Sequence, residues 1–175
     1  MEGLPKSVSD LKTKKGGGVW VGRRGKLLGF PRIKKLAILV DLDGTLVDVS
    51  GIRHLVERPN PDFDAFHRDS VNCPPKKQVV QILRLFRCLR VSVIIVSARS
   101  ENYRTLTNMW LAIQAIQCDD LLMRGTRDSR RDVEVKTSMY EKLSHRYFMI
   151  AALDDRDELV QNWKLLGIPF VYHVS

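Results

Sequence analysis

The sequence predicts an α/β fold: a doubly wound parallel sheet with helices on both faces. Apolar runs of strand length alternate with segments of helical periodicity, which is the pattern of βαβ units. Several of these runs are continuously apolar, as in strands that are buried on both faces. Three of them end in acidic or hydroxyl side chains, and the carboxyl ends of such strands are where open α/β sheets bind ligands. The 175 residues are enough for one domain of this kind.

The expected elements alternate along most of the chain. Strands are expected at about 36–40, 91–97, 120–123, 149–153 and 169–174. Helices are expected at about 76–89, 101–116, 132–146 and 157–166. Apolar residues of the first helix form a core-facing stripe without a functional role. The insertion at 47–75 is too short for a full cap domain, so we expect a short lid beside an open site.

Two aspartates directly follow the first strand. Asp41 and Asp43 are two residues apart, so in extended backbone both side chains leave the same face. Gly44 then permits a sharp turn. Two carboxylates at such close range are stabilised by a cation between them. The alternative is an Asp-Gly turn in which the aspartates only cap backbone groups.

A hydroxyl and a guanidinium end the second strand. Ser97 can donate to a phosphoryl oxygen, and Arg99 can bind two oxygens at once. A serine at this place, Ser97 or Ser100, is also an ordinary N-cap for the helix that follows.

A basic segment follows the third strand. Five of the thirteen residues 124–136 are Lys or Arg, including Arg124. Lys136 falls in the first turns of a helix, from which its ammonium can reach a nucleophile and a phosphate. Asp132 lies one turn earlier on the same face and can orient it. The alternative is a lysine on a solvated helix face.

An acidic pair, Asp154 and Asp155, ends the fourth strand. Carboxylate oxygens suit a hard, octahedral cation. The four histidines are scattered, and we expect none of them to belong to the site; they are His54, His67, His145 and His173.

These four motifs, in this order, resemble those of the haloacid-dehalogenase superfamily of phosphotransferases, whose sheet is Rossmann-like. The resemblance implies that Asp41 is a nucleophile that forms an aspartyl-phosphate and that Asp43 is the general acid/base. It also implies a Mg²⁺ site made by Asp41, the backbone carbonyl of Asp43 and Asp154. Asp155 would contact the ligands of this ion or contact the ion through a bound water.

Longer segments narrow the resemblance. Residues 62–67, 124–136 and 153–167 resemble the 3′-phosphatase domain of the phage-type polynucleotide kinase/phosphatase. This implies that Arg99, Arg124 and Asp132 help to bind the phosphate or the polynucleotide end. Ala98 departs from the family pattern, where Gly is usual. Residues 49–58 do not align, so the resemblance leaves open whether Arg53 or Arg58 also binds phosphate.

The glycine-rich cradle of a kinase, ending in Gly-Lys-Ser/Thr, does not occur in the sequence. We therefore expect a free-standing phosphatase, with a separate kinase or ligase as possible partner.

Positive charge is concentrated at the N-terminus. Residues 1–35 hold ten Lys or Arg and two acids, whereas the rest holds 19 against 18. We expect a glycine-rich basic arm with a small hairpin, 19–21 and 26–28 flanking 22–25, followed by the phosphatase domain at 36–175. The arm can bind phosphates and stack a base, or it can be a solvated tail.

Three functions fit the sequence. The first is a Mg²⁺-dependent 3′-phosphatase that repairs ends of DNA or RNA; the second is a nucleotidase or other small-molecule phosphatase; the third is a nucleic-acid-binding module that has lost activity. Cys73, Cys88 and Cys118 show no paired metal-ligand spacing and predict reduced thiols. The sequence also has no apolar stretch of the kind found in signal peptides or membrane spans. Together with the reduced thiols, this favours a cytoplasmic location and no membrane partner.

Overall fold

The computed structural model describes residues 19–21, 27–29 and 33–175. The chain separates after Ile33 into two units. In the first unit, β1 (Val19–Val21) pairs with β2 (Leu27–Gly29) in antiparallel register, with Trp20 opposite Leu28. The expected turn at 22–25 and most of the basic arm lie outside the described residues.

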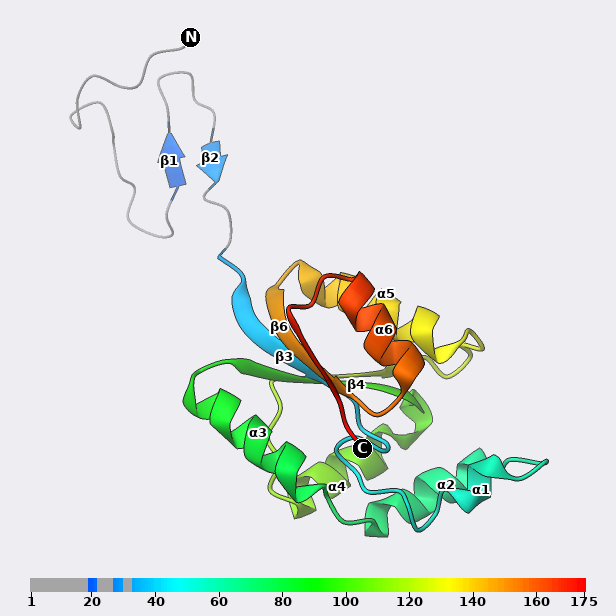
Figure 1. Ribbon diagram of the computed structural model, residues 1–175. Coiled ribbons are helices and arrows are strands. Elements are labelled where there is room, and N and C mark those ends of the chain that lie inside the picture. The colour runs from blue at the N-terminus through cyan, green and yellow to red at the C-terminus, as the bar shows by residue number, and fades with distance from the viewer. Residues whose placement is uncertain (1–18, 22–26, 30–32) are drawn as a thin grey trace. The chain divides into compact units, whose positions relative to one another are not determined.

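The second unit is built on a five-stranded sheet in the order β5-β4-β3-β6-β7 (Figure 1). The strands are β3 (Lys35–Val40), β4 (Ser92–Ser100), β5 (Asp120–Arg124), β6 (Tyr147–Asp154) and β7 (Phe170–His173). Every neighbouring pair in this sheet is parallel. The predicted doubly wound α/β class is therefore confirmed.

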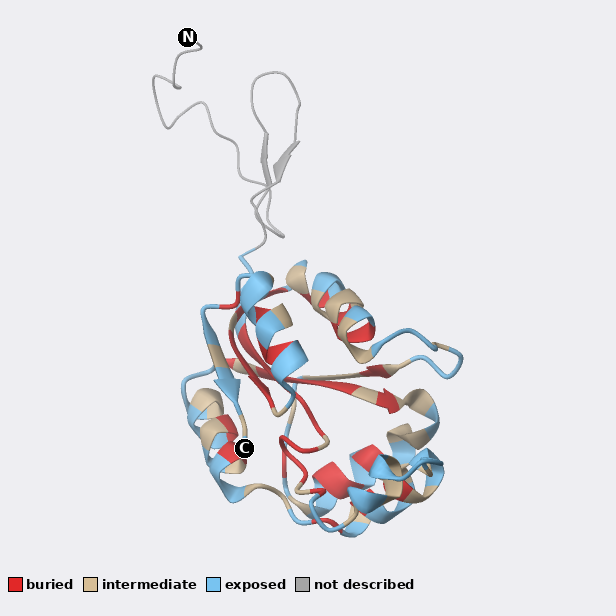
Figure 2. Ribbon diagram, turned by 45° about the vertical axis from the view of Figure 1, so that its right-hand side comes forward, coloured by how far each residue is buried: buried red, intermediate tan, exposed pale blue. Residues whose placement is uncertain are grey.

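Helices cover both faces of this sheet. They are α1 (His54–Glu57), α2 (Phe63–Asp69), α3 (Lys77–Cys88), α4 (Arg104–Ile113), α5 (Asp132–Ser144) and α6 (Asp157–Leu165), with 3₁₀ turns η2 (Ser70–Asn72) and η3 (Glu101–Tyr103). The alternation along β3 explains the layers: Ile38 and Val40 pack with α3 and α4, whereas Ala37 and Leu39 pack with α5 and α6. Figure 2 shows the buried residues concentrated in the central strands and on the helix sides that face them.

The end of β4 differs from the expectation. The strand continues to Ser100, and its register with β5 shifts between Ser97 and Ser100. An irregularity of this kind re-aims side chains at a strand end. Ser100 accepts a hydrogen bond from the backbone N–H of Asn102 (3.3 Å) and so caps η3, after which α4 is shorter than the predicted helix.

The insertion at 47–75 forms α1, α2 and η2, beside the carboxyl end of the sheet (Figure 1). Asp62 caps α2 by accepting a hydrogen bond from the backbone N–H of Ala65 (2.9 Å). The insertion is anchored to the core because the Trp110 indole donates to the carbonyl of Cys73 (2.8 Å). Its action as a lid stays a prediction.

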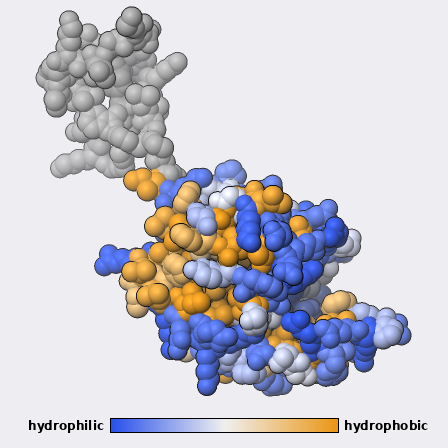
Figure 3. Space-filling model, viewed as in Figure 1, coloured by the Kyte–Doolittle hydropathy of each residue, from blue (hydrophilic) through white to orange (hydrophobic). Residues whose placement is uncertain are grey.

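The α3/α4 face of the sheet is only partly covered. Leu36 and Phe148 lie opposite each other on β3 and β6, and Phe170 and Tyr172 occupy the same face of β7. All four side chains are about half exposed. Figure 3 shows apolar side chains gathered over this part of the molecule. Among the described residues, no helix has both the length and the apolar character needed to cross a lipid bilayer.

Candidate active site

A cavity of about 760 Å³ opens at the carboxyl end of the sheet. One wall is polar and includes Asp41, Asp43, Ser97, Lys136 and Asp155. A second part of the lining comes from the insertion and from η3, and includes Val56, Phe63, Phe66, His67 and Tyr103. The topology thus brings the four motifs together at one edge, as expected for parallel strands.

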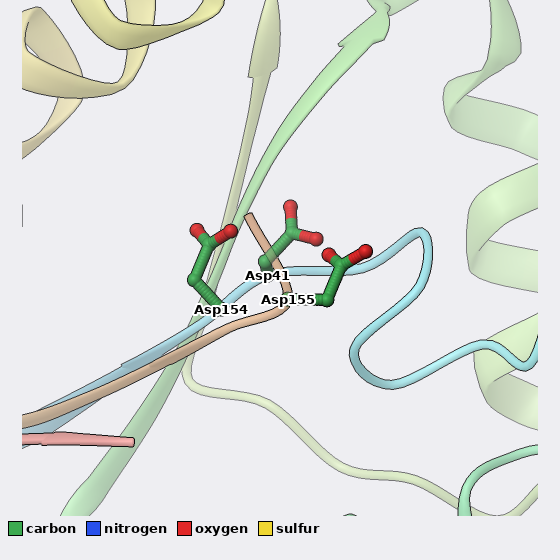
Figure 4. Close-up of side chains that lie close together, drawn as sticks. All are labelled: Asp41, Asp154 and Asp155. Atoms are coloured by element: carbon green, nitrogen blue, oxygen red, sulfur yellow. The ribbon is translucent and has the colours of Figure 1, made fainter. Parts of the chain in front are cut away.

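Three carboxylates converge at the base of the polar wall. Asp41, Asp154 and Asp155 each offer an oxygen, and these oxygens lie within 4.8 Å of one another. Figure 4 shows the three side chains side by side, at the ends of β3 and β6. The backbone N–H of Asp41 donates to the carbonyl of Leu153 (2.9 Å), which fixes the two strand ends relative to each other.

Gly44 is required for this arrangement. Its φ is +90°, a conformation that other residues rarely adopt. A Cβ atom at this position would lie 2.1 Å from a carboxylate oxygen of Asp155. Any larger residue would therefore push Asp155 away from the other two aspartates.

Lys136 bridges two of the three carboxylates. Its ammonium is buried and donates to Asp41 Oδ1 (2.6 Å) and Asp154 Oδ2 (2.9 Å). Burial alone would lower the pKa of Lys136, but the carboxylates of Asp41 and Asp154 outweigh it and raise the pKa. The lysine is therefore charged at neutral pH.

The carboxylates remain crowded in spite of Lys136. Burial raises the pKa of Asp41 to about 8, with Lys136 opposing the shift and Asp154 and Asp155 adding to it. Like charges at this range favour a bound cation, and a donor set made only of carboxylate oxygens suits a hard ion such as Mg²⁺. The residues present therefore fit the magnesium ion that the sequence predicted.

The outer two aspartates are held by further contacts. Asp154 Oδ2 accepts from the Trp163 indole (3.2 Å), and its Oδ1 accepts from the backbone N–H of Arg156 (3.3 Å). Asp155 accepts from the Thr45 hydroxyl (3.2 Å) and from Arg53 (3.2 Å). Such contacts fix the direction in which each carboxylate points.

Asp43 is not one of the three converging carboxylates, and it pairs with Arg99. The guanidinium binds both carboxylate oxygens of Asp43 and also donates to the Thr107 hydroxyl (3.2 Å). Ser97 Oγ accepts from the backbone N–H of Arg99 (3.1 Å). The Arg99 side chain is 2% exposed and pairs with Asp43 in this structure; that it binds phosphate, as the resemblance implied, stays a prediction.

Arg124 is likewise engaged within the protein. It donates to the carbonyls of Ala98 (2.8 Å), Asp128 (3.1 Å) and Arg130 (2.6 Å), and it pairs with Asp132. It thereby ties the end of β5 to the following loop and to the start of α5.

Asp132 has a different role from the one expected. We predicted that it orients Lys136, but its carboxylate oxygens accept from Arg124 and Arg156. Lys136 takes its orientation from Asp41 and Asp154. Spacing along the helix could not identify the partner of Asp132, because its two arginine partners come from other elements.

Sequence reasoning missed three residues of the cavity. Arg53 and Arg156 line it with side chains about half exposed, so their guanidinium groups can meet a solvent-borne anion. His67 also lines it, contrary to the expectation that no histidine belongs to the site. Burial lowers the pKa of His67 to about 4, and its buried Nδ1 has no hydrogen-bond partner. His67 and Arg156 fall in the segments 62–67 and 153–167 that carry the resemblance, but the segments alone do not show that these side chains reach the cavity. Arg53 lies in the stretch that does not align with the family.

Comparison with known proteins agrees with this geometry. Residues 35–174 match the family described as the polynucleotide kinase PNKP phosphatase domain. A protein of Autographa californica nuclear polyhedrosis virus that bears the name bifunctional polynucleotide kinase/RNA ligase is 28% identical over 148 residues, which are 83% of this chain and 20% of the viral protein.

Solved structures show the same fold. A chain of the Pnkp1/Rnl/Hen1 complex is 30% identical and superposes with a TM-score of 0.70 over 81% of this chain and 45% of its own length. The class C acid phosphatase of Bacillus anthracis shares the fold at 17% identity, with a TM-score of 0.61 over 81% of this chain and 68% of its own.

The chain thus spans a fifth of the viral relative and less than half of the Pnkp1/Rnl/Hen1 relative. The match runs through β3 to β7 and includes all four motifs. The chain belongs to the phosphatase-domain family of polynucleotide kinase PNKP, and it is a phosphoric monoester hydrolase of the haloacid-dehalogenase type.

Proposed function

We propose that the protein is a Mg²⁺-dependent phosphatase that removes the 3′-phosphate from polynucleotide ends through an aspartyl-phosphate on Asp41. The main support is the bridge from Lys136 to Asp41 and Asp154, beside Asp155, at the base of a cavity of about 760 Å³. This arrangement supports a site in which Asp41 is the nucleophile, Lys136 is a fixed positive charge and the carboxylates are oxygen ligands.

The reaction takes two steps. A carboxylate oxygen of Asp41 attacks the phosphorus, the bond from phosphorus to the 3′-oxygen breaks, and Asp43 gives its proton to that oxygen. Water then attacks the phosphorus of the aspartyl-phosphate and passes a proton to Asp43. The bond from phosphorus to the Asp41 oxygen breaks, so inorganic phosphate is released and the Asp41 carboxylate is restored. Arg99 keeps the Asp43 carboxyl aimed during both transfers.

Positive charge around the phosphate comes from several elements. Lys136 of α5 lies against Asp41, and Arg53 and Arg156 line the cavity from the insertion and from the loop after β6. Ser97 at the end of β4 adds a hydroxyl. Groups fixed before the reaction stabilise the charge that develops on the phosphoryl oxygens.

Mg²⁺ would be held by Asp41, Asp154 and Asp155 together with the backbone carbonyl of Asp43. When bound, it supplies a positive charge that neutralises phosphoryl oxygens and returns Asp41 to its ionised form.

The polynucleotide substrate is supported by the family and by the open cavity. Without a full cap domain, a large substrate can approach the polar wall. The related Pnkp1/Rnl/Hen1 assembly is described as an RNA repair complex. We accordingly place this chain in nucleic-acid end repair in the cytoplasm, with a kinase or a ligase as partner, in the same chain or a separate one.

A matched set of substrates tests the proposal. One oligonucleotide sequence is prepared in two forms, one with a 3′-phosphate and the other with a 5′-phosphate. The nucleoside 3′-monophosphate is the third substrate. The Asp41→Asn variant is the control for contaminating activity. We expect the highest kcat/KM for the 3′-phosphorylated oligonucleotide. Preference for the mononucleotide would instead indicate a nucleotidase, and absence of turnover with any substrate would indicate a binding module.

A further inference from the structure

Part of the cavity lining, which we call the aromatic wall, consists of aromatic side chains from α2 and η3, namely Phe63, Phe66, His67 and Tyr103. Phe63 of α2 lines the cavity and is 60% exposed, whereas its neighbour Phe66 is buried in the core. Tyr103 of η3 lines the same side of the cavity. None of the groups that take part in the proposed phosphoryl transfer is aromatic, so the aromatic wall has no role in the chemistry proposed above.

Contacts between distant segments hold this wall in place. The Tyr103 hydroxyl donates to Asp64 Oδ1 (2.5 Å), which joins η3 to α2. The His67 ring lies 4.6 Å from the Tyr103 ring and 5.4 Å from the Phe66 ring, measured between centroids. These contacts tie Tyr103 of η3 to α2, so the two elements that carry the wall are fixed relative to each other.

The polar and aromatic walls together have the composition of a nucleotide site. The polar wall suits a phosphate, and a nucleobase is the part of a nucleotide that binds an aromatic side chain by stacking. A cavity of about 760 Å³ also has room for more than a phosphate. Phe63 is the one phenylalanine of the wall that is open to such a contact, since Phe66 is buried.

We propose that Phe63 and Tyr103 form a binding subsite for the base of the 3′-terminal nucleotide, which stacks there while its phosphate lies at Asp41. The subsite rests on the proposed function, and it makes the enzyme select ends that carry a base. Selection is independent of base identity, because every base presents an aromatic face.

Two oligonucleotides that differ only at the 3′-terminal residue test the subsite. Both carry a 3′-phosphate; one ends in a normal nucleotide and the other in an abasic residue. We expect the wild-type protein to favour the normal end in kcat/KM by about 5- to 150-fold, the range typical of one stacked base. In Phe63→Ala and Phe63→Leu this ratio should fall toward one, since leucine keeps the apolar volume but lacks the ring.

Phe148→Ala is the matched control. Phe148 is also an exposed phenylalanine, at 54%, but it lies on β6 and does not line the cavity. It should retain the wild-type ratio. Thermal melting of all three variants should show that the fold is kept, because neither side chain is buried.

Each failure is distinguishable. Equal kcat/KM for the two ends in the wild-type protein, or a full preference in Phe63→Leu, would overturn the subsite and leave the 3′-phosphatase assignment intact. If neither oligonucleotide is turned over while a small phosphomonoester is hydrolysed, the proposed function fails and the subsite fails with it.

Discussion

Asp41 is held in place by several independent contacts. It is fixed through its backbone to the end of β6, through one carboxylate oxygen to Lys136, and by the proximity of Asp154 and Asp155. These contacts aim a carboxylate at the cavity and keep it from other hydrogen-bond partners. Single substitutions can therefore test whether Asp41 is the nucleophile.

The substitutions Asp41→Asn and Asp43→Asn should each abolish turnover with the fold intact. The first removes the nucleophile and the second removes the proton carrier, so their signatures differ. With an activated phosphomonoester, whose leaving group needs no proton, some aspartyl-phosphate should still form in Asp43→Asn, but none should form in Asp41→Asn. Acid-quenched protein can be examined for bound phosphate by mass spectrometry, and wild-type rates in Asp41→Asn would refute the assignment.

Arg99→Lys separates the two roles that are open to this residue. If Arg99 orients Asp43, as the structure indicates, lysine should lower kcat by about tenfold or more with little change in KM, because it cannot hold both carboxylate oxygens. The pH profile of kcat should shift as well, since the partner of Asp43 has changed. A raised KM with unchanged kcat would show that Arg99 binds phosphate, as the sequence suggested.

At the scale of elements, the aromatic wall depends on how α2 packs against η3. His67 lies at this contact with its pKa lowered to about 4 by burial, with Asp43 and Asp64 raising it in part and Arg99 lowering it further. Its imidazole is therefore neutral at pH 7.

His67 should make the protein less stable in mild acid. The unfolded chain takes up a proton at this residue near pH 6.5, whereas the folded protein does so only near pH 4. Between these values the unfolded state binds more protons, so the free energy of unfolding should fall as the pH drops, by at most roughly 3 kcal/mol. His67→Gln should lack this component. An imidazole that titrates near pH 6.5 by NMR in the folded protein would contradict it.

The elements that the sequence predicted well are those with the strongest physical signal. β3, β4 and β6 are continuous apolar runs because both their faces are buried, and the acidic or hydroxyl residues that follow them reached the expected edge. α1 and α2 gave no signal, since four and seven residues are too few to show helical periodicity.

The sequence also could not predict which carboxylates the arginines pair with. Arg53 meets Asp155 across 102 positions, and Arg99 meets Asp43 across 56. Spacing along the chain identifies the motif residues but not which charges pair once the strands are placed side by side. The distinction between an arginine that binds phosphate and one that orients a carboxylate therefore needed the fold.

For the whole molecule, the distribution of charge sets the question of how nucleic acid is held. Residues 1–35 contribute most of the formal net charge of +9, and the phosphatase domain is nearly neutral. Recognition can therefore depend on the basic arm, on the arginines of the cavity, or on both.

Deletion of residues 1–35 tests the arm. If the arm binds phosphates, oligonucleotide affinity should weaken, and the slope of log K against log salt should fall by roughly 0.7 for each lost contact with a single strand. Turnover of a small phosphomonoester should barely change, because the motif residues all follow the deletion. Unchanged affinity and slope would show that the arm is a solvated tail.

The most direct test of the central claim follows the phosphate itself. The protein is mixed with an oligonucleotide whose 3′-phosphate is radiolabelled, quenched in acid and digested, and the label is mapped. We expect labelled protein only with Mg²⁺ present, with the label on the peptide that contains Asp41, and none in EDTA or in Asp41→Asn. Release of labelled phosphate in EDTA, or full turnover by Asp41→Asn, would contradict the account.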